Sequence, residues 1–132
     1  MKLVAIILLS VLIPSCSKSR AEFPGIKLIE CESYVINGEE TRLCFDQLVS
    51  DSRCPHNMDC IWAGVGVAKF TFHKNNEVHT LTLATMNVTN QYSKDTTVAG
   101  YKIELLDLHP YPGTIANPQA EDRTAEVMLT RL

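Results

Sequence analysis

The segment from Cys54 to Cys60 gathers side chains that can bind a soft metal ion. It contains two thiols, the imidazole of His56 and the thioether of Met58. Thiolate and thioether ligands suit Cu(I), and zinc accepts cysteine and histidine. Five residues separate the two cysteines, whereas paired metal-binding cysteines are usually roughly two to four residues apart. Copper or zinc binding through Cys54, His56, Met58 and Cys60 is therefore the alternative hypothesis, and the leading one assigns the chain no cofactor.

The same segment does not fit redox or hydrolytic catalysis. Its cysteines are not arranged as Cys-x-x-Cys, and no strand–helix–strand pattern typical of thioredoxin surrounds them. Ser52 lacks the glycines of a nucleophile elbow, and the four histidines are scattered along the chain. Each of these histidines is more typical of a surface or loop position than of a general base. We therefore expect a protein that is not an enzyme.

The first fifteen residues resemble the signal peptide of a bacterial lipoprotein. Lys2 precedes an eleven-residue stretch, 3–13, that is apolar apart from Ser10. A membrane-spanning helix needs roughly 20 residues, so this stretch is too short. It ends in Ile13-Pro-Ser-Cys16, which resembles a lipobox. The resemblance implies that residues 1–15 are removed, that Cys16 is lipidated, and that residues 16–24 form a tether.

The N-terminal segment also bears on the net charge and the expected localisation of the mature protein. Loss of Lys2 with the signal peptide changes the formal net charge from −3 to −4, and no basic cluster remains. Nucleic acid is therefore not an expected partner, because phosphate binding needs clustered Lys and Arg. Ser17, rather than Asp, follows the lipidated cysteine. We expect a bacterial cell-envelope protein that a lipid holds at the outer membrane, facing the periplasm.

The remaining four cysteines predict two disulfides. An even number of cysteines in a small exported domain is typical of disulfide bonds. The most local pairing joins Cys31 to Cys44 and Cys54 to Cys60, and the other two connectivities stay open. A bond that closes the short Cys54–Cys60 ring stabilises the fold by about 2 kcal/mol in the loop-closure model.

The residues around this ring predict a structural staple. Pro55 stiffens the first turn, and Arg53 can bind Asp51, Asp59 or nearby carbonyls. We expect Trp62 to bury its ring just inside the next strand. Gly64 and Gly66 would let that ring, or another part of the backbone, approach closely.

The motif Asp51-Ser-Arg-Cys-Pro55, followed by Cys60-Ile-Trp-Ala-Gly64, resembles a family of small uncharacterised bacterial proteins that are often lipid-anchored. The similarity continues more weakly through residues 101–108, two prolines and the last strand. It implies a fold but no activity. Val65 differs from the family, in which an acidic residue is common, and the pair Cys31 and Cys44 is an addition.

Alternating apolar and polar residues predict short strands throughout the mature chain. The expected strands are 25–30, 32–36, 41–49, 61–73, 78–84, 98–108 and 122–132, with a further short strand within 86–97. Asn37-Gly38 predicts a hairpin turn, and a change of phase at Leu106 predicts a bulge. The fold class is therefore all-β, as an antiparallel sandwich or small open barrel of about six to eight strands, in one domain spanning residues 25–132.

The stretch 109–121 is rich in proline and glycine and predicts a long loop. Its residues His109 and Tyr111 offer a recognition surface, since loops on a rigid sandwich commonly bind partners. We expect a non-catalytic module that binds another envelope protein or has an accessory role. The oligomeric state stays open.

Overall fold

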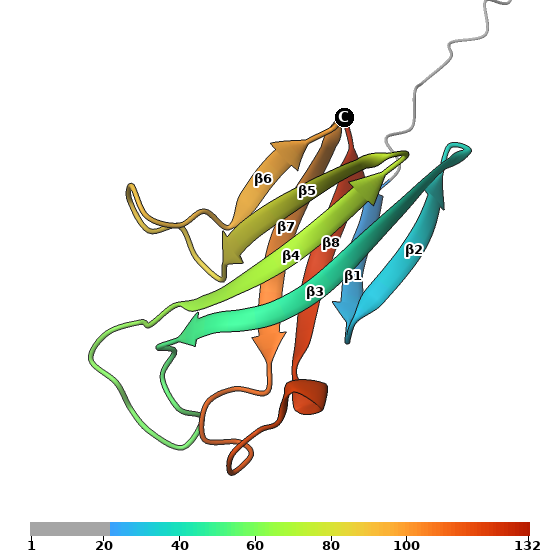
Figure 1. The fold of residues 1–132 in the computed structure, drawn as a ribbon. Coiled ribbons are helices and arrows are strands. Elements are labelled where there is room, and N and C mark those ends of the chain that lie inside the picture. Colours follow the sequence, from blue (N-terminus) through green and yellow to red (C-terminus); the bar gives the residue numbers. More distant parts are fainter. Residues whose placement is uncertain (1–21) are drawn as a thin grey trace, which may run out of the picture.

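Two four-stranded antiparallel sheets make up the fold (Figure 1). The computed structural model describes residues 22–132. One sheet has the order β1-β8-β7-β6 and the other the order β2-β3-β4-β5. The strands are β1 (Glu22–Leu28), β2 (Cys31–Ile36), β3 (Glu39–Asp51), β4 (Gly66–Lys74), β5 (Glu77–Ala84), β6 (Asp95–Val98), β7 (Tyr101–His109) and β8 (Thr124–Arg131). The all-β prediction is confirmed in its sandwich form, because residues 22–132 form two separate four-stranded sheets and no closed barrel.

The core lies between the sheets and follows the predicted alternation. Phe70 and Phe72 of β4 are fully buried, as are Ile103 and Leu105 of β7. In β8, the buried apolar residues are Ala125, Val127 and Leu129. The predicted bulge is present, because the β7–β8 register shifts between Leu105 and Asp107. The shift leaves one residue of β7 without a partner in β8. The side chain of Leu108 therefore faces the core again, where it is almost completely buried.

Two turns decide the strand boundaries. Asn37 and Gly38 both have positive φ angles and join β2 to β3, as predicted. Ala99 and Gly100 also have positive φ angles, of 49° and 81°. The chain therefore turns where one continuous strand, 98–108, was expected, so this prediction is wrong at its start. Val98 ends β6, and Tyr101 begins β7.

The two disulfides have the local connectivity. Cys31 lies directly opposite Cys44 in the β2–β3 ladder, and the bond joins them across the strands. The second bond closes the ring between Cys54 and Cys60, with a Cα–Cα distance of 5.8 Å. Both bonds agree with the more local of the pairings left open by the sequence.

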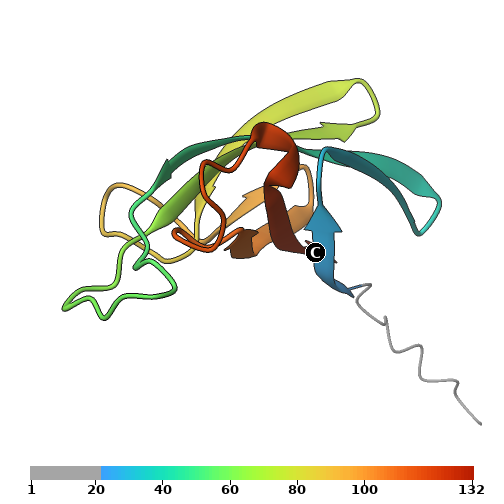
Figure 2. The same cartoon turned by 90° about the horizontal axis from the view of Figure 1, so that it is seen from below.

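The two ends of the sandwich differ. At the entry end, Glu22 of β1 pairs with Thr130 near the end of β8. At the opposite end, residues 52–65 join β3 to β4, and residues 110–119 follow β7 (Figures 1 and 2). We call these two segments the loop end. A short 3-10 turn, η1 (Ala120–Asp122), connects it to β8.

The N-terminal predictions are only partly covered by the structure. The expected signal peptide, 1–15, and Cys16 lie outside the described residues. β1 begins at Glu22, three residues before the expected start of the domain, so the end of the expected tether belongs to a strand. No helix within residues 22–132 is long and apolar enough to span a membrane.

Candidate binding surface at the loop end

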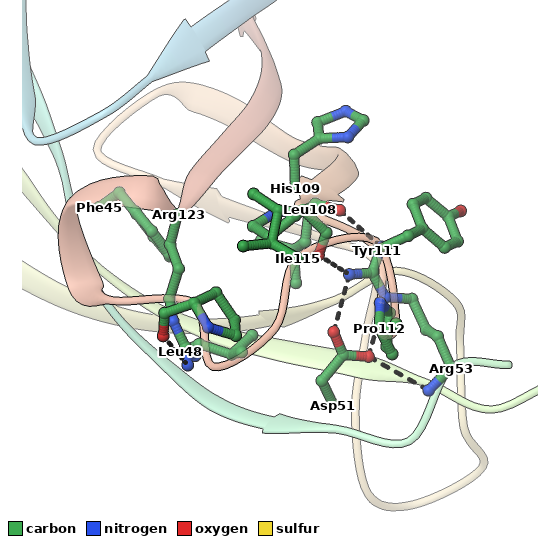
Figure 3. Close-up of a pocket in the computed structure, with 13 residues that line it drawn as sticks. Phe45, Leu48, Asp51, Arg53, Leu108, His109, Tyr111, Pro112, Ile115 and Arg123 are labelled. Carbon is green, nitrogen blue, oxygen red and sulfur yellow. Dashed lines mark hydrogen bonds and ion pairs between the residues drawn. The ribbon is translucent and has the colours of Figure 1, made fainter. Parts of the chain in front are cut away.

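A buried arginine holds the loop end together. Arg53 is only 7 % exposed, and it forms a bidentate ion pair with Asp51. Its Nε donates to Asp51 Oδ1 at 2.9 Å, and its Nη2 donates to Asp51 Oδ2 at 2.7 Å (Figure 3). The sequence offered Asp51 as one of several partners, and the structure selects it over Asp59.

The same guanidinium reaches the other sheet. Its Nη1 donates to Asp107 Oδ1 at 3.0 Å and to the Leu108 carbonyl at 2.6 Å. Its Nη2 donates to the Pro110 carbonyl at 3.3 Å, and the ring of Tyr111 stacks 4.2 Å from its Cζ atom. Arg53 therefore connects the end of β3 to the end of β7 and to the start of the 110–119 loop.

Two carboxylates stabilise this buried cation. Burial by itself lowers the pKa of Arg53, but the hydrogen bond to Asp51 and the charges of Asp51 and Asp107 raise it, so that the net shift is upward. Because the cation and its two carboxylates satisfy one another, Arg53 serves as a structural junction and offers no unpaired charge to a ligand.

The base of the 52–65 loop is closed by backbone contacts. The Ser52 amide donates to the Val65 carbonyl at 2.9 Å, and the Val65 amide donates to Ser52 Oγ at 3.0 Å. A Cβ atom at Gly64 would overlap the Ser52 carbonyl. The prediction that Gly64 allows a close backbone approach is therefore supported, and the approaching group is backbone instead of the indole.

Trp62 does not occupy the core. Its side chain is 68 % exposed, and the neighbouring Ile61 is 93 % exposed. The prediction that Trp62 is buried is therefore wrong. β4 begins only at Gly66, so residues 61–65 belong to the loop. The space beside Gly66 is occupied by the side chains of Arg53 and Leu108.

The two loops support each other. The His56 amide donates to the Pro112 carbonyl at 2.9 Å, and Gly113 lies against Pro55 and Asn57. The ring that contains Pro55 is thus packed on the 110–119 loop. A side chain at Gly113 would be strained, because its φ angle is 79°.

The 109–121 stretch displays apolar groups around a hollow. Tyr111 and Ile115 are each more than one-third exposed, and His109 lies with Nε2 3.7 Å from Asp107 Oδ2. The hollow has a volume of about 240 Å³. Its apolar lining includes Phe45, Leu48, Leu108, Ile115 and Pro118, with Arg123 at its edge (Figure 3). The predicted loop and the cysteine motif therefore form one surface.

The copper or zinc alternative receives no geometric support. Cys54 and Cys60 are bonded to each other, so neither sulfur is a thiolate ligand. Met58 and His56 are exposed on the ring. Within residues 22–132, no three His, Cys, Asp or Glu side chains form a group that can hold a metal.

Sequence reasoning missed half of the Arg53 junction. Asp107 lies 54 residues from Arg53, and its only local signal is its position in the predicted bulge. The Leu108 and Pro110 carbonyls carry no side-chain signal at all. The apolar residues Ile61 and Trp62 were recognised as features of the motif, but their exposure was not.

No protein-family model, curated protein or solved structure matches this chain. The resemblance to the family of small bacterial proteins therefore stays a prediction.

Proposed function

We propose that this chain is a non-catalytic protein-binding module of the bacterial cell envelope, anchored through a lipid on Cys16. The loop end is its binding surface. The observation that carries this proposal is the exposure of Ile61 and Trp62 on a loop that Arg53 and the Cys54–Cys60 bond hold in place.

Rigid exposed aromatic groups suit protein recognition. Trp and Tyr are enriched among the residues that contribute most to protein interfaces. Exposed apolar side chains gain free energy when a partner removes them from water, at roughly 25 cal/mol per Å². A loop that is already ordered loses less conformational entropy on binding. Trp62, Ile61 and Tyr111 are exposed apolar side chains at the loop end, and the Cys54–Cys60 bond and the Arg53 contacts hold the segments that carry them.

The position of the anchor supports a protein partner over the lipid surface. The chain enters the sandwich at Glu22, at the end opposite the loop end (Figure 1). Five residues separate Cys16 from Glu22, and a segment of this length can reach at most about 20 Å. With Cys16 in the outer membrane, the loop end faces away from the bilayer and into the periplasm.

The experiment places a benzophenone amino acid at position 62 of the full chain in intact cells. Val35 is also an exposed apolar residue, on β2 near the entry end, and provides the matched control position. Irradiation should join another envelope protein to position 62 and not to position 35. An absence of heterologous adducts at position 62, or equal adducts at both positions, would instead favour a purely accessory role.

A further inference from the structure

The loop end carries both a projection and a hollow. We define the apolar tip as Met58, Ile61 and Trp62, all of which are more than half exposed. The hollow is lined by Phe45, Leu48, Leu108, Ile115 and Pro118, among others. We propose that a second copy of this chain docks here, with the apolar tip of each copy in the hollow of the other. This deepens the proposed function, because it uses the same surface.

The sizes of the two features match. An apolar cavity of about 150 Å³ accepts a benzene ring. The hollow of about 240 Å³ therefore has room for a larger ring such as an indole. Its volume is below the roughly 300–1,000 Å³ of sites for drug-sized ligands and cofactors. One large side chain is the occupant that this volume fits, and Trp62 is the only tryptophan of the chain.

One favourable charge pair is available across the contact. Asp59, beside the apolar tip, is exposed and forms no ion pair with a described residue. Arg123, at the edge of the hollow, donates to the Pro118 carbonyl at 3.4 Å and pairs with no carboxylate in residues 22–132. Three carboxylates that do not pair with Arg123 line the adjoining hollow beside it, namely Glu30, Asp46 and Glu121, so Arg123 is the one cation among the described residues there that can attract Asp59. Docking would bring Asp59 of each copy towards Arg123 of the other.

The symmetry and the area fit a weak dimer. A two-fold contact uses the same patch on both subunits, and here the tip and the hollow both belong to that patch. An aromatic side chain carries roughly 150–250 Å² of surface, so the five exposed side chains Met58, Ile61, Trp62, Tyr111 and Ile115 offer on the order of 500 Å² per copy. The resulting total of about 1,000 Å² lies at the lower limit of specific interfaces.

A membrane would favour such a dimer. If the two-fold axis runs along the membrane normal, both chains enter from the same side, and the two loop ends meet side by side. Anchored copies are confined to one surface, which raises their effective concentration. Binding of another envelope protein and formation of the dimer then compete, because each would cover Trp62.

The test uses the purified full chain in phosphatidylethanolamine–phosphatidylglycerol vesicles, with no other protein present. A benzophenone amino acid at position 62 should give a covalent dimer after irradiation, with the adduct in residues 108–118. Ile115→Arg, which fills the hollow, should lower the dimer yield at least fivefold. Val35→Arg, at the other end of the sandwich, should leave it unchanged.

A charge exchange tests the register of the two copies. Asp59→Arg and Arg123→Asp should each reduce the dimer yield, and the double variant should restore most of it. A monomer at all surface densities, adducts on a sheet edge, or a double variant no better than the single ones would overturn the proposal. Should Arg123→Asp fail to fold, Ile115→Arg decides, since it alters a partly exposed side chain. Heterologous adducts in cells without a homodimer in vesicles would reject this inference and retain the proposed function.

Discussion

Replacing Arg53 by methionine should remove the junction that holds the loop end. Methionine keeps an apolar stem but leaves Asp51 and Asp107 without their cation. The side chain of Asp51 is 12 % exposed and that of Asp107 is 30 % exposed. Removing one member of a buried ion pair costs about 3–5 kcal/mol, and the partial exposure of Asp107 places the expected loss near the lower end, at about 3 kcal/mol. For a domain with an unfolding free energy of roughly 5–15 kcal/mol, this is a large fraction.

Urea unfolding followed by far-UV circular dichroism measures this loss, with both disulfides kept oxidised. Trp62 fluorescence is a poor reporter, because the indole is already exposed in the folded protein. Arg42→Met is the matched control, since Arg42 is exposed and forms no ion pair with a described residue, and it should cost less than about 0.5 kcal/mol. Asp51→Asn should cost less in the Arg53→Met background than alone. A loss below about 1 kcal/mol for Arg53→Met would refute the reasoning.

Four further predictions concern the loop, the ring, a tyrosine and the anchor. Gly64→Ala should destabilise the fold by at least about 2 kcal/mol in the same urea assay, because its Cβ overlaps a backbone carbonyl. Cys60→Ala should cost about 2 kcal/mol by opening the ring, whereas Met58→Ala should leave the unfolding free energy nearly unchanged. Burial raises the pKa of Tyr34 to about 12 from the ordinary 10.0. The contribution of the Tyr34 side chain to stability is therefore present below pH 10 and is lost as the pH rises towards 12. Stopped-flow absorbance of tyrosinate, together with unfolding at each pH, will measure this loss. Intact-mass analysis of protein extracted from the envelope should show an acylated N-terminus at Cys16, which Cys16→Ala abolishes.

For each of these predictions, one experimental result would contradict it. A fully stable Gly64→Ala variant would mean that the loop base is not closed as described. Equal damage from the Cys60 and Met58 variants would indicate a shared metal instead of a disulfide. A Tyr34→Phe variant that loses stability over the same alkaline range as the parent would remove Tyr34 as the cause. A mature protein without acyl groups would leave the domain unanchored.

The sheet framework was predictable because its signals are local and periodic. Phe70 and Phe72 alternate with polar residues, and the alternation alone places them on the buried face of β4. Asn37-Gly38 specifies the β2–β3 turn through its positive φ angles. The β2–β3 ladder then brings Cys31 opposite Cys44, which explains why the most local disulfide pairing is found.

The loop end was only partly predictable, because its contacts join residues that are distant in sequence. Residue type favoured burial of Trp62, but the space beside Gly66 is taken by Arg53 and Leu108. That arrangement depends on Asp107, which a bulge in β7 positions. No local pattern specifies which carboxylate will reach a given arginine. The residues proposed from the cysteine motif and those proposed from the 109–121 loop therefore lie on one surface. Neither segment alone predicted that they would be neighbours.

The most direct test of the binding surface is hydroxyl-radical footprinting of Trp62 in two states of the full chain. In the purified protein at low concentration, the exposed indole should be oxidised rapidly, and in native envelopes a bound protein should reduce this oxidation several-fold. Oxidation of Val35, at the entry end, should be similar in both states. Equal oxidation of Trp62 in both states would show that nothing covers the loop end and would contradict a protein-binding role.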